Sequence, residues 1–194
     1  MFPTTVWEDV EAAGGRDPEA LERIAQQYRP AIVAFIRSRG IDGSAAEDLC
    51  QEVFVRLMSG DVLAKADSAR GRFRSLLCTV TVRVIQDWGR RRKDVPTADL
   101  DPAALEPDFD RVWALHLVER GLKRLEEASP RSYEVLRDHL SGQKPDRNKL
   151  WIARGKLISL VRREIAVTCR SSKELDEEVQ CLSPYLRPAG GPPK

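Results

Sequence analysis

Apolar residues recur at three- and four-residue intervals along most of the chain, which places them on one face of a helix. Pro30 and Gly40 interrupt this pattern, and Ser44 with Glu47 forms a capping box in front of a new apolar face. In the first half, the pattern therefore predicts helices over residues 18–28, 32–39, 44–58 and 73–92.

The last of these segments also contains a run of β-branched residues, Val80-Thr81-Val82-Arg83-Val84. Taken alone, this run favours a strand. The apolar spacing across the whole segment has the longer period of a helix, and we therefore predict a helix here.

Residues 94–107 differ in character, because prolines alternate with acidic residues and large apolar side chains are almost absent. We predict a linker here. Beyond it, the helical spacing returns over 109–128, 130–140, 145–165 and 171–182. The expected fold class is all-α, with two small helical domains at 1–93 and 108–182 and a disordered tail at 183–194.

The composition narrows the classes of function. No stretch approaches the roughly 20 apolar residues that span a bilayer, so we expect a cytoplasmic protein without a membrane partner. The four cysteines are far apart and lack the spacing of a zinc site, which favours reduced, buried thiols. There is no phosphate-binding glycine loop, paired nucleophile or cluster of metal ligands, and we expect no catalytic residue, metal or cofactor.

The net charge is only +2, from 32 basic and 30 acidic residues, but the basic residues are unevenly distributed. Between residues 70 and 93 a single acid, Asp87, accompanies eight basic residues: Arg70, Arg72, Arg74, Arg83, Arg90, Arg91, Arg92 and Lys93. This imbalance suits phosphate contacts, although a solvated helix end that complements the helix dipole is an equal alternative. Trp88 beside the cluster suits base stacking or a place in the core.

Two consecutive segments resemble extracytoplasmic-function (ECF) sigma factors. Ala46-Glu47-Asp48-Leu49-Cys50-Gln51-Glu52-Val53-Phe54-Val55-Arg56-Leu57 resembles their polymerase-clamp-binding helix. Residues 73–92 are similar to their promoter-melting and minus-ten-reading helices. The flanks 2–7, 161–165 and 174–179 are similar to a divergent subgroup of sigma-like proteins.

The resemblance implies a fold, partners and site residues. It implies a region 2-like helical bundle followed by a reduced, helix-turn-helix-like region 4. The implied partners are core RNA polymerase, promoter DNA and, as a further option, an anti-sigma factor. The residues that would face the clamp helices of the largest polymerase subunit, rather than form an ordinary solvated face, are Asp48, Gln51, Glu52 and Arg56. Those implied along minus-ten DNA are Arg74, Arg83, Asp87, Trp88, Arg90, Arg91, Arg92 and Lys93, with Asp87 partly buttressing its neighbouring arginines.

The chain departs from the family at two places. Val82-Arg83 stands where family members carry Arg-Asn, whereas capture of a flipped base needs polar groups that read its edge. In the second half, only residues 141–144 separate the segments similar to the first helices of the minus-35 domain and to its recognition helix. The scaffold helix that braces a recognition helix is missing.

The basic residues after this gap have two interpretations. Arg147, Lys149 and Arg154 suit non-specific DNA binding, whereas a plain amphipathic helix with Trp151 in its core explains the same segment equally well.

Three functions agree with these patterns. The first is a transcription initiation factor that binds polymerase and helps to open the minus-ten element, without being an enzyme. The second is a degenerate sigma-like regulator that binds polymerase or another protein without reading a promoter. The third is a general nucleic-acid-binding module, since fold alone does not prove function.

Overall fold

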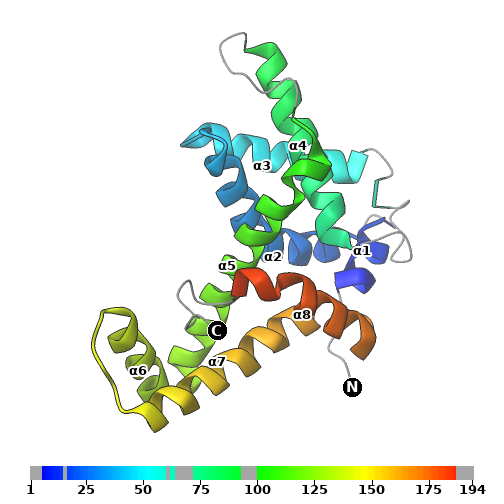
Figure 1. Cartoon of the computed structure of the whole chain (residues 1–194). Helices are drawn as coiled ribbons and strands as arrows, with labels where there is room; N and C mark the ends of the chain where they lie inside the picture. The colour runs from blue at the N-terminus through cyan, green and yellow to red at the C-terminus, as the bar shows by residue number, and fades with distance from the viewer. Residues whose placement is uncertain (1–5, 15–16, 60–61, 64–71, 93–99, 187–194) are drawn as a thin grey trace. The chain divides into compact units, whose positions relative to one another are not determined.

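The computed structural model describes residues 6–14, 17–59, 62–63, 72–92 and 100–186, and these residues form helices without a strand. The predicted all-α class is confirmed. The chain divides into two compact units, 6–113 and 114–186 among the described residues, and each is described by itself (Figure 1). None of the described helices is long and apolar enough to cross a membrane.

The first unit holds α1 (Val6–Gly14), α2 (Pro18–Ser38), α3 (Ser44–Ser59), α4 (Phe73–Arg91) and the beginning of α5 (Pro102–Ala128). Asp17 caps α2, because its carboxylate accepts a hydrogen bond of 2.9 Å from the backbone N–H of Glu19. Gly40 and Gly43 follow α2 with φ angles of +79° and +64°, which glycine adopts without strain.

The predicted break at Pro30 is wrong, because α2 continues through this proline. Pro30 is exposed, so the carbonyl that loses its helical partner can face water. On either side, Tyr28 and Ile32 are 1% and 0% exposed. Their burial holds both parts of the helix against the core.

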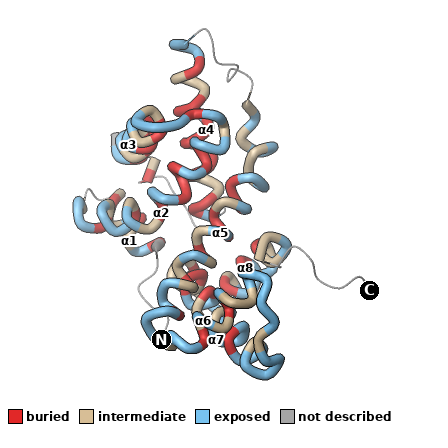
Figure 2. Tube along the Cα trace, turned by 90° about the vertical axis from the view of Figure 1, so that its left-hand side faces the viewer, coloured by how far each residue is buried: buried red, intermediate tan, exposed pale blue. Residues whose placement is uncertain are grey.

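The β-branched run in α4 is helical, as the longer period predicted. Val80, Val82 and Val84 are buried, and the Thr81 hydroxyl donates to the carbonyl of Leu77 one turn earlier at 2.7 Å. Buried positions run along α4 (Figure 2), so tertiary packing outweighs the weak strand preference of these residues.

Helix α5 begins at Pro102, inside the segment predicted to be a linker. Asp101 precedes it and accepts a hydrogen bond of 3.0 Å from the backbone N–H of Ala103, which satisfies a donor at the start of the helix. The first unit extends along this helix to Trp113, further than the predicted domain end at residue 93.

Aromatic side chains from three helices form the centre of the first unit. Tyr28 of α2 stacks on Trp113 of α5 with ring centroids 4.6 Å apart, and it meets Phe73 of α4 edge to face at 5.4 Å. Phe35 and Phe109 make a second edge-to-face pair at 5.1 Å. The start of α5 thus completes the core of this unit.

The second unit contains the remainder of α5 with α6 (Pro130–Leu140), α7 (Arg147–Ala166) and α8 (Ser172–Leu186). Residues 141–146 are all described and contain no helix, in agreement with the missing scaffold helix. Asp146 caps α7 by accepting hydrogen bonds from the N–H groups of Asn148 and Lys149, both at 3.0 Å. Helix α8 extends to Leu186, four residues into the predicted disordered tail, and residues 187–194 lie outside the described residues.

In the second unit, a hydrophobic cluster joins α5, α6 and α7. Leu125, Leu136 and Ala153 are buried at its centre. Gly121 of α5 faces Val161 of α7 so closely that a Cβ at position 121 would lie 2.8 Å from the Val161 Cγ2 atom. The two helices approach each other at this glycine because it has no side chain.

Candidate functional site

Helix α3 has one buried face and one free face. Leu49, Val53 and Leu57 are 6%, 0% and 0% exposed against the core. Asp48 and Gln51, two of the predicted polymerase-binding residues, are exposed on the other side. Val55 and Met58 are also exposed, at 54% and 53%, and so add apolar surface to this free face.

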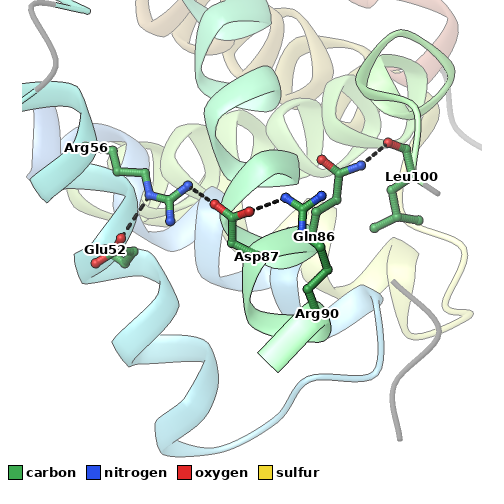
Figure 3. Close-up of polar contacts among 6 residues, drawn as sticks. All are labelled: Glu52, Arg56, Gln86, Asp87, Arg90 and Leu100. Carbon is green, nitrogen blue, oxygen red and sulfur yellow. Dashed lines mark hydrogen bonds and ion pairs between the residues drawn. The ribbon is translucent and has the colours of Figure 1, made fainter. Parts of the chain in front are cut away.

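The other two residues predicted to bind polymerase, Glu52 and Arg56, are half-buried and join a network with α4. The Arg56 guanidinium donates to the Glu52 carboxylate at 2.9 Å and to the Asp87 carboxylate at 2.5 Å (Figure 3). Arg90 donates to the other oxygen of Asp87. Asp87 therefore holds one arginine of α3 and one of α4, in line with its predicted buttressing role.

The contacts in this network shift the pKa values of Asp87 and Arg56. Hydrogen bonds from Arg90 and then from Arg56 lower the pKa of Asp87, so this carboxylate stays ionised. Burial works against the charge of Arg56, but its hydrogen bonds to Glu52 and Asp87 outweigh that cost and raise its pKa. The ion pair between Asp87 and Arg56 consequently remains charged across the physiological range of pH.

Four of the predicted DNA-binding cations, on α4 and directly after it, are exposed to solvent. Arg83, Arg90, Arg91 and Arg92 are exposed. Arg83 and Arg90 lie on the same face as Asp87, at spacings of four and three residues from it. Lys93 and Arg70 lie outside the described residues. Near the end of α4, the Gln86 amide donates to the Leu100 carbonyl at 2.7 Å and holds the chain before α5 against α4 (Figure 3).

A groove of about 330 Å³ lies between the start of α3 and the end of α4. Its lining residues are Ser44, Ala45, Asp48, Leu49, Glu52, Val84, Trp88, Arg91 and Arg92. Trp88 is half-buried in this lining, and the Arg92 guanidinium lies 5.0 Å from the centre of its ring, within cation-π distance. The groove thus has carboxylates on its α3 side and cations with an aromatic ring on its α4 side.

The predicted DNA contact of Arg74 conflicts with its burial. Its side chain is 3% exposed, and its Nε atom lies 2.5 Å from the carboxylate of Asp110, which is 7% exposed. This ion pair connects α4 to the start of α5, so Arg74 has a structural role in the first unit. The sequence pattern did not single out Asp110; the available signal is its place three and four residues before Trp113 and Ala114, on the apolar side of this segment.

Val82, at the position of the first departure from the family, is 0% exposed. Its side chain belongs to the core, and the neighbouring Arg83 is the residue of the pair that reaches solvent. The polar groups that contact a flipped base at this place would therefore have to belong to Arg83 or to the residues that line the groove.

The three cations predicted in the second half, Arg147, Lys149 and Arg154, are exposed on α7 in the second unit. Arg154 lies 2.9 Å from the Nε2 atom of His139. The alternative with Trp151 in a helix core is wrong, because this side chain is 78% exposed.

The thiols are unsuited to chemistry. Cys50, Cys78 and Cys169 are buried, as predicted, and Cys181 is half-buried. Burial raises the pKa of Cys50 to about 11 and that of Cys78 to about 12. Among the described residues, no group of histidine, cysteine and acidic side chains could hold a metal ion. The exposed faces and the groove have the character of a binding surface.

Part of the chain is similar to a known protein family. Residues 24–95 match the family model of Sigma-70 region 2. The match covers most of α2 with α3 and α4, and it likens this segment to region 2 of sigma factors, a family that acts in transcription initiation without catalysing a reaction. It covers fewer than half of the 194 residues and none of the second unit. Neither the curated proteins nor the solved structures contain a match.

Proposed function

We propose that the chain is a transcription initiation factor of the ECF sigma type that acts in the cytoplasm. Its α3 face, with Asp48, Gln51 and Glu52, binds the clamp helices of core RNA polymerase. The exposed arginines at the end of α4 bind the minus-ten region of promoter DNA and help to open it. Polymerase supplies the chemistry, and this chain contributes binding energy that is spent on distorting the DNA.

The observation that carries the proposal is the link between Arg56 of α3 and Asp87 of α4. It connects the helix with the proposed polymerase contacts to the helix with the proposed DNA contacts. Because Asp87 also holds Arg90, the cation beside the DNA is oriented by the same carboxylate. Such a network supports a rigid surface on which polymerase and DNA are bound in a fixed relation.

The proposal is tested with core polymerase and a promoter library randomised in both promoter elements. Transcripts are sequenced, and strand opening is followed with a fluorescent base analogue in the minus-ten strand. We expect transcription that depends on the chain and selects a minus-ten sequence. Polymerase binding without any strand opening would contradict this function.

Two sets of variants locate the surfaces. Substituting Asp48, Gln51 and Glu52 with alanine should weaken core binding, whereas the matched exposed pair Glu22→Ala and Gln26→Ala on α2 should not. Arg90→Ala with Arg91→Ala should leave core binding intact and reduce opening. Removal of two phosphate contacts should weaken DNA binding about evenly across sequences.

A second candidate is a sigma-like regulator that occupies polymerase without reading a promoter. The buried Val82 and the turn at 141–146 in place of a scaffold helix favour it. Core binding that blocks another sigma factor, without selecting any promoter, would support this candidate. DNA binding with no affinity for polymerase would instead indicate a general nucleic-acid-binding module.

A further inference from the structure

Helix α7 of the second unit has a buried face and an exposed apolar stripe. Ala153 and Val161 are 0% and 7% exposed on the buried face. Outside this buried face, Trp151 and Ile158 are 78% and 67% exposed. These two residues are seven positions apart, so they lie above one another two helical turns apart. Single exposed apolar residues are common, but two large ones on one stripe indicate an interaction surface.

Gly155 lies between these two side chains, four residues after Trp151 and three before Ile158. A Cβ at position 155 would meet no described atom within 4 Å, whereas one at Gly121 would meet Val161 at 2.8 Å. Packing among the described residues therefore explains Gly121 but not Gly155. Glycine is a poor helix former, and a glycine between two large side chains leaves a notch into which another helix can fit.

The exposed charged side chains of α7 itself are all basic, and one of them, Arg162, pairs with Asp176 of α8 at 2.6 Å. The exposed charged residues of α7 are Arg147, Lys149, Arg154, Lys156, Arg162 and Arg163. The acidic residue of this helix, Glu164, is 1% exposed and lies between Arg120 and Arg124 of α5, at 2.7 and 2.5 Å. A partner of this face must therefore combine apolar side chains with negative charge.

We propose that the α7 stripe, defined as Trp151, Gly155 and Ile158, binds an amphipathic helix of a partner protein whose apolar face is flanked by acidic residues. In this mode of recognition, an apolar helix face is laid against a hydrophobic surface and anchored at a few central residues, among which tryptophan is common. The acidic flanks of the partner pair with Arg147 and Arg154. The surface belongs to the second unit, so the proposal does not depend on polymerase or promoter binding by the first.

Duplex DNA fits the same cations but not the stripe. The floor of the major groove presents mostly hydrogen-bonding groups, and thymine methyls are its main apolar feature. Two large apolar side chains at the centre of the contact would displace water from polar base edges without replacing the lost hydrogen bonds. The stripe therefore favours a protein partner over DNA.

The test uses the full chain as bait for a displayed library of helical peptides with randomised apolar, acidic and basic positions. We expect enrichment of peptides with an apolar face and acidic flanks. Their affinity, measured by fluorescence anisotropy, should fall by about tenfold or more for a Trp151→Ser/Ile158→Ser variant, because both central anchors are lost. The control, Leu115→Ser, removes an exposed apolar residue of α5 in the same unit and should have no effect.

The Gly155→Ala variant distinguishes an effect on peptide binding from an effect on folding, because the two should change in opposite directions. Alanine should raise the midpoint of thermal unfolding, because it is the better helix former and meets open space. The same change should weaken the binding of the selected peptides several-fold, since the methyl group fills the notch. A more stable variant that binds the peptides unchanged would refute the close approach of a partner helix.

A short DNA duplex of mixed sequence provides the remaining comparison. We expect Trp151→Ser/Ile158→Ser to leave its binding unchanged and Arg147→Ala/Arg154→Ala to weaken it. The proposal would be overturned if acidic peptides were not enriched. It would also be overturned if the enriched peptides bound the Trp151→Ser/Ile158→Ser variant as tightly as the wild type. Loss of duplex binding in the serine variant would assign the stripe to DNA instead.

Discussion

Arg56 of α3 and Asp87 of α4 are joined by an ion pair of 2.5 Å, and the second oxygen of Asp87 is held by Arg90. A residue predicted to bind polymerase and one predicted to lie along DNA thus contact each other directly. Because both side chains are about one-third exposed, at 27% and 32%, the link is more important for orientation than for stability.

Asp87→Asn should lower the free energy of unfolding at neutral pH by roughly 0.5–1 kcal/mol, the range of partly exposed ion pairs. The pKa of Asp87 is lowered in the folded protein, so its contribution is complete above the unfolded-state pKa. It is lost as the pH falls through the lower folded-state pKa. Urea unfolding at a series of pH values should therefore show the wild type and the variant converging in acid. A difference that stays constant with pH would contradict this expectation.

Arg74→Met should destabilise the first unit by about 3–5 kcal/mol, because it leaves the Asp110 carboxylate buried without this partner. Arg74→Met combined with Asp110→Leu removes both charges and should restore much of the loss. Chemical denaturation of the two variants measures this difference. If the double variant were no more stable than Arg74→Met alone, the unpaired Asp110 carboxylate would not be the reason for the loss of stability.

Gly121→Ala and Gly155→Ala should change stability in opposite directions. At position 121 the new methyl group meets Val161, and overpacking of this kind costs about 1–3 kcal/mol. At position 155 the methyl group meets open space, and the gain in helix propensity is up to about 1 kcal/mol. Thermal unfolding of both variants is the measurement, and equal shifts of the same sign would contradict the packing described here.

The Cys50 and Cys78 thiols should react slowly with a thiol reagent at mildly alkaline pH. Burial raises the pKa of these thiols to about 11 and about 12, so the reactive thiolate is scarce in the folded protein. Mass spectrometry of labelled peptides should find both sites modified only after denaturant is added. Fast labelling of either site in the native protein would indicate that its helix opens locally.

The sequence by itself determined the all-α class and most helix positions, because a period of three to four residues in apolar spacing is a local property of the chain. It also determined the free face of α3 around Asp48 and Gln51, since burial of Leu49 and Val53 on one side leaves the other to solvent. The resemblance of residues 46–57 and 73–92 to sigma factors agrees with the match to Sigma-70 region 2.

Only the tertiary structure decided which of the charged and aromatic side chains are buried and which are exposed. Arg74 and Arg90 belong to the same basic run, yet the start of α5 supplies Asp110 to bury the first and leaves the second exposed. Trp151 suited a core by its spacing, but Ala153 and the cluster around it lie on the opposite face of α7. These outcomes depend on which residues from distant parts of the chain meet, and apolar periodicity within one helix carries no information about that.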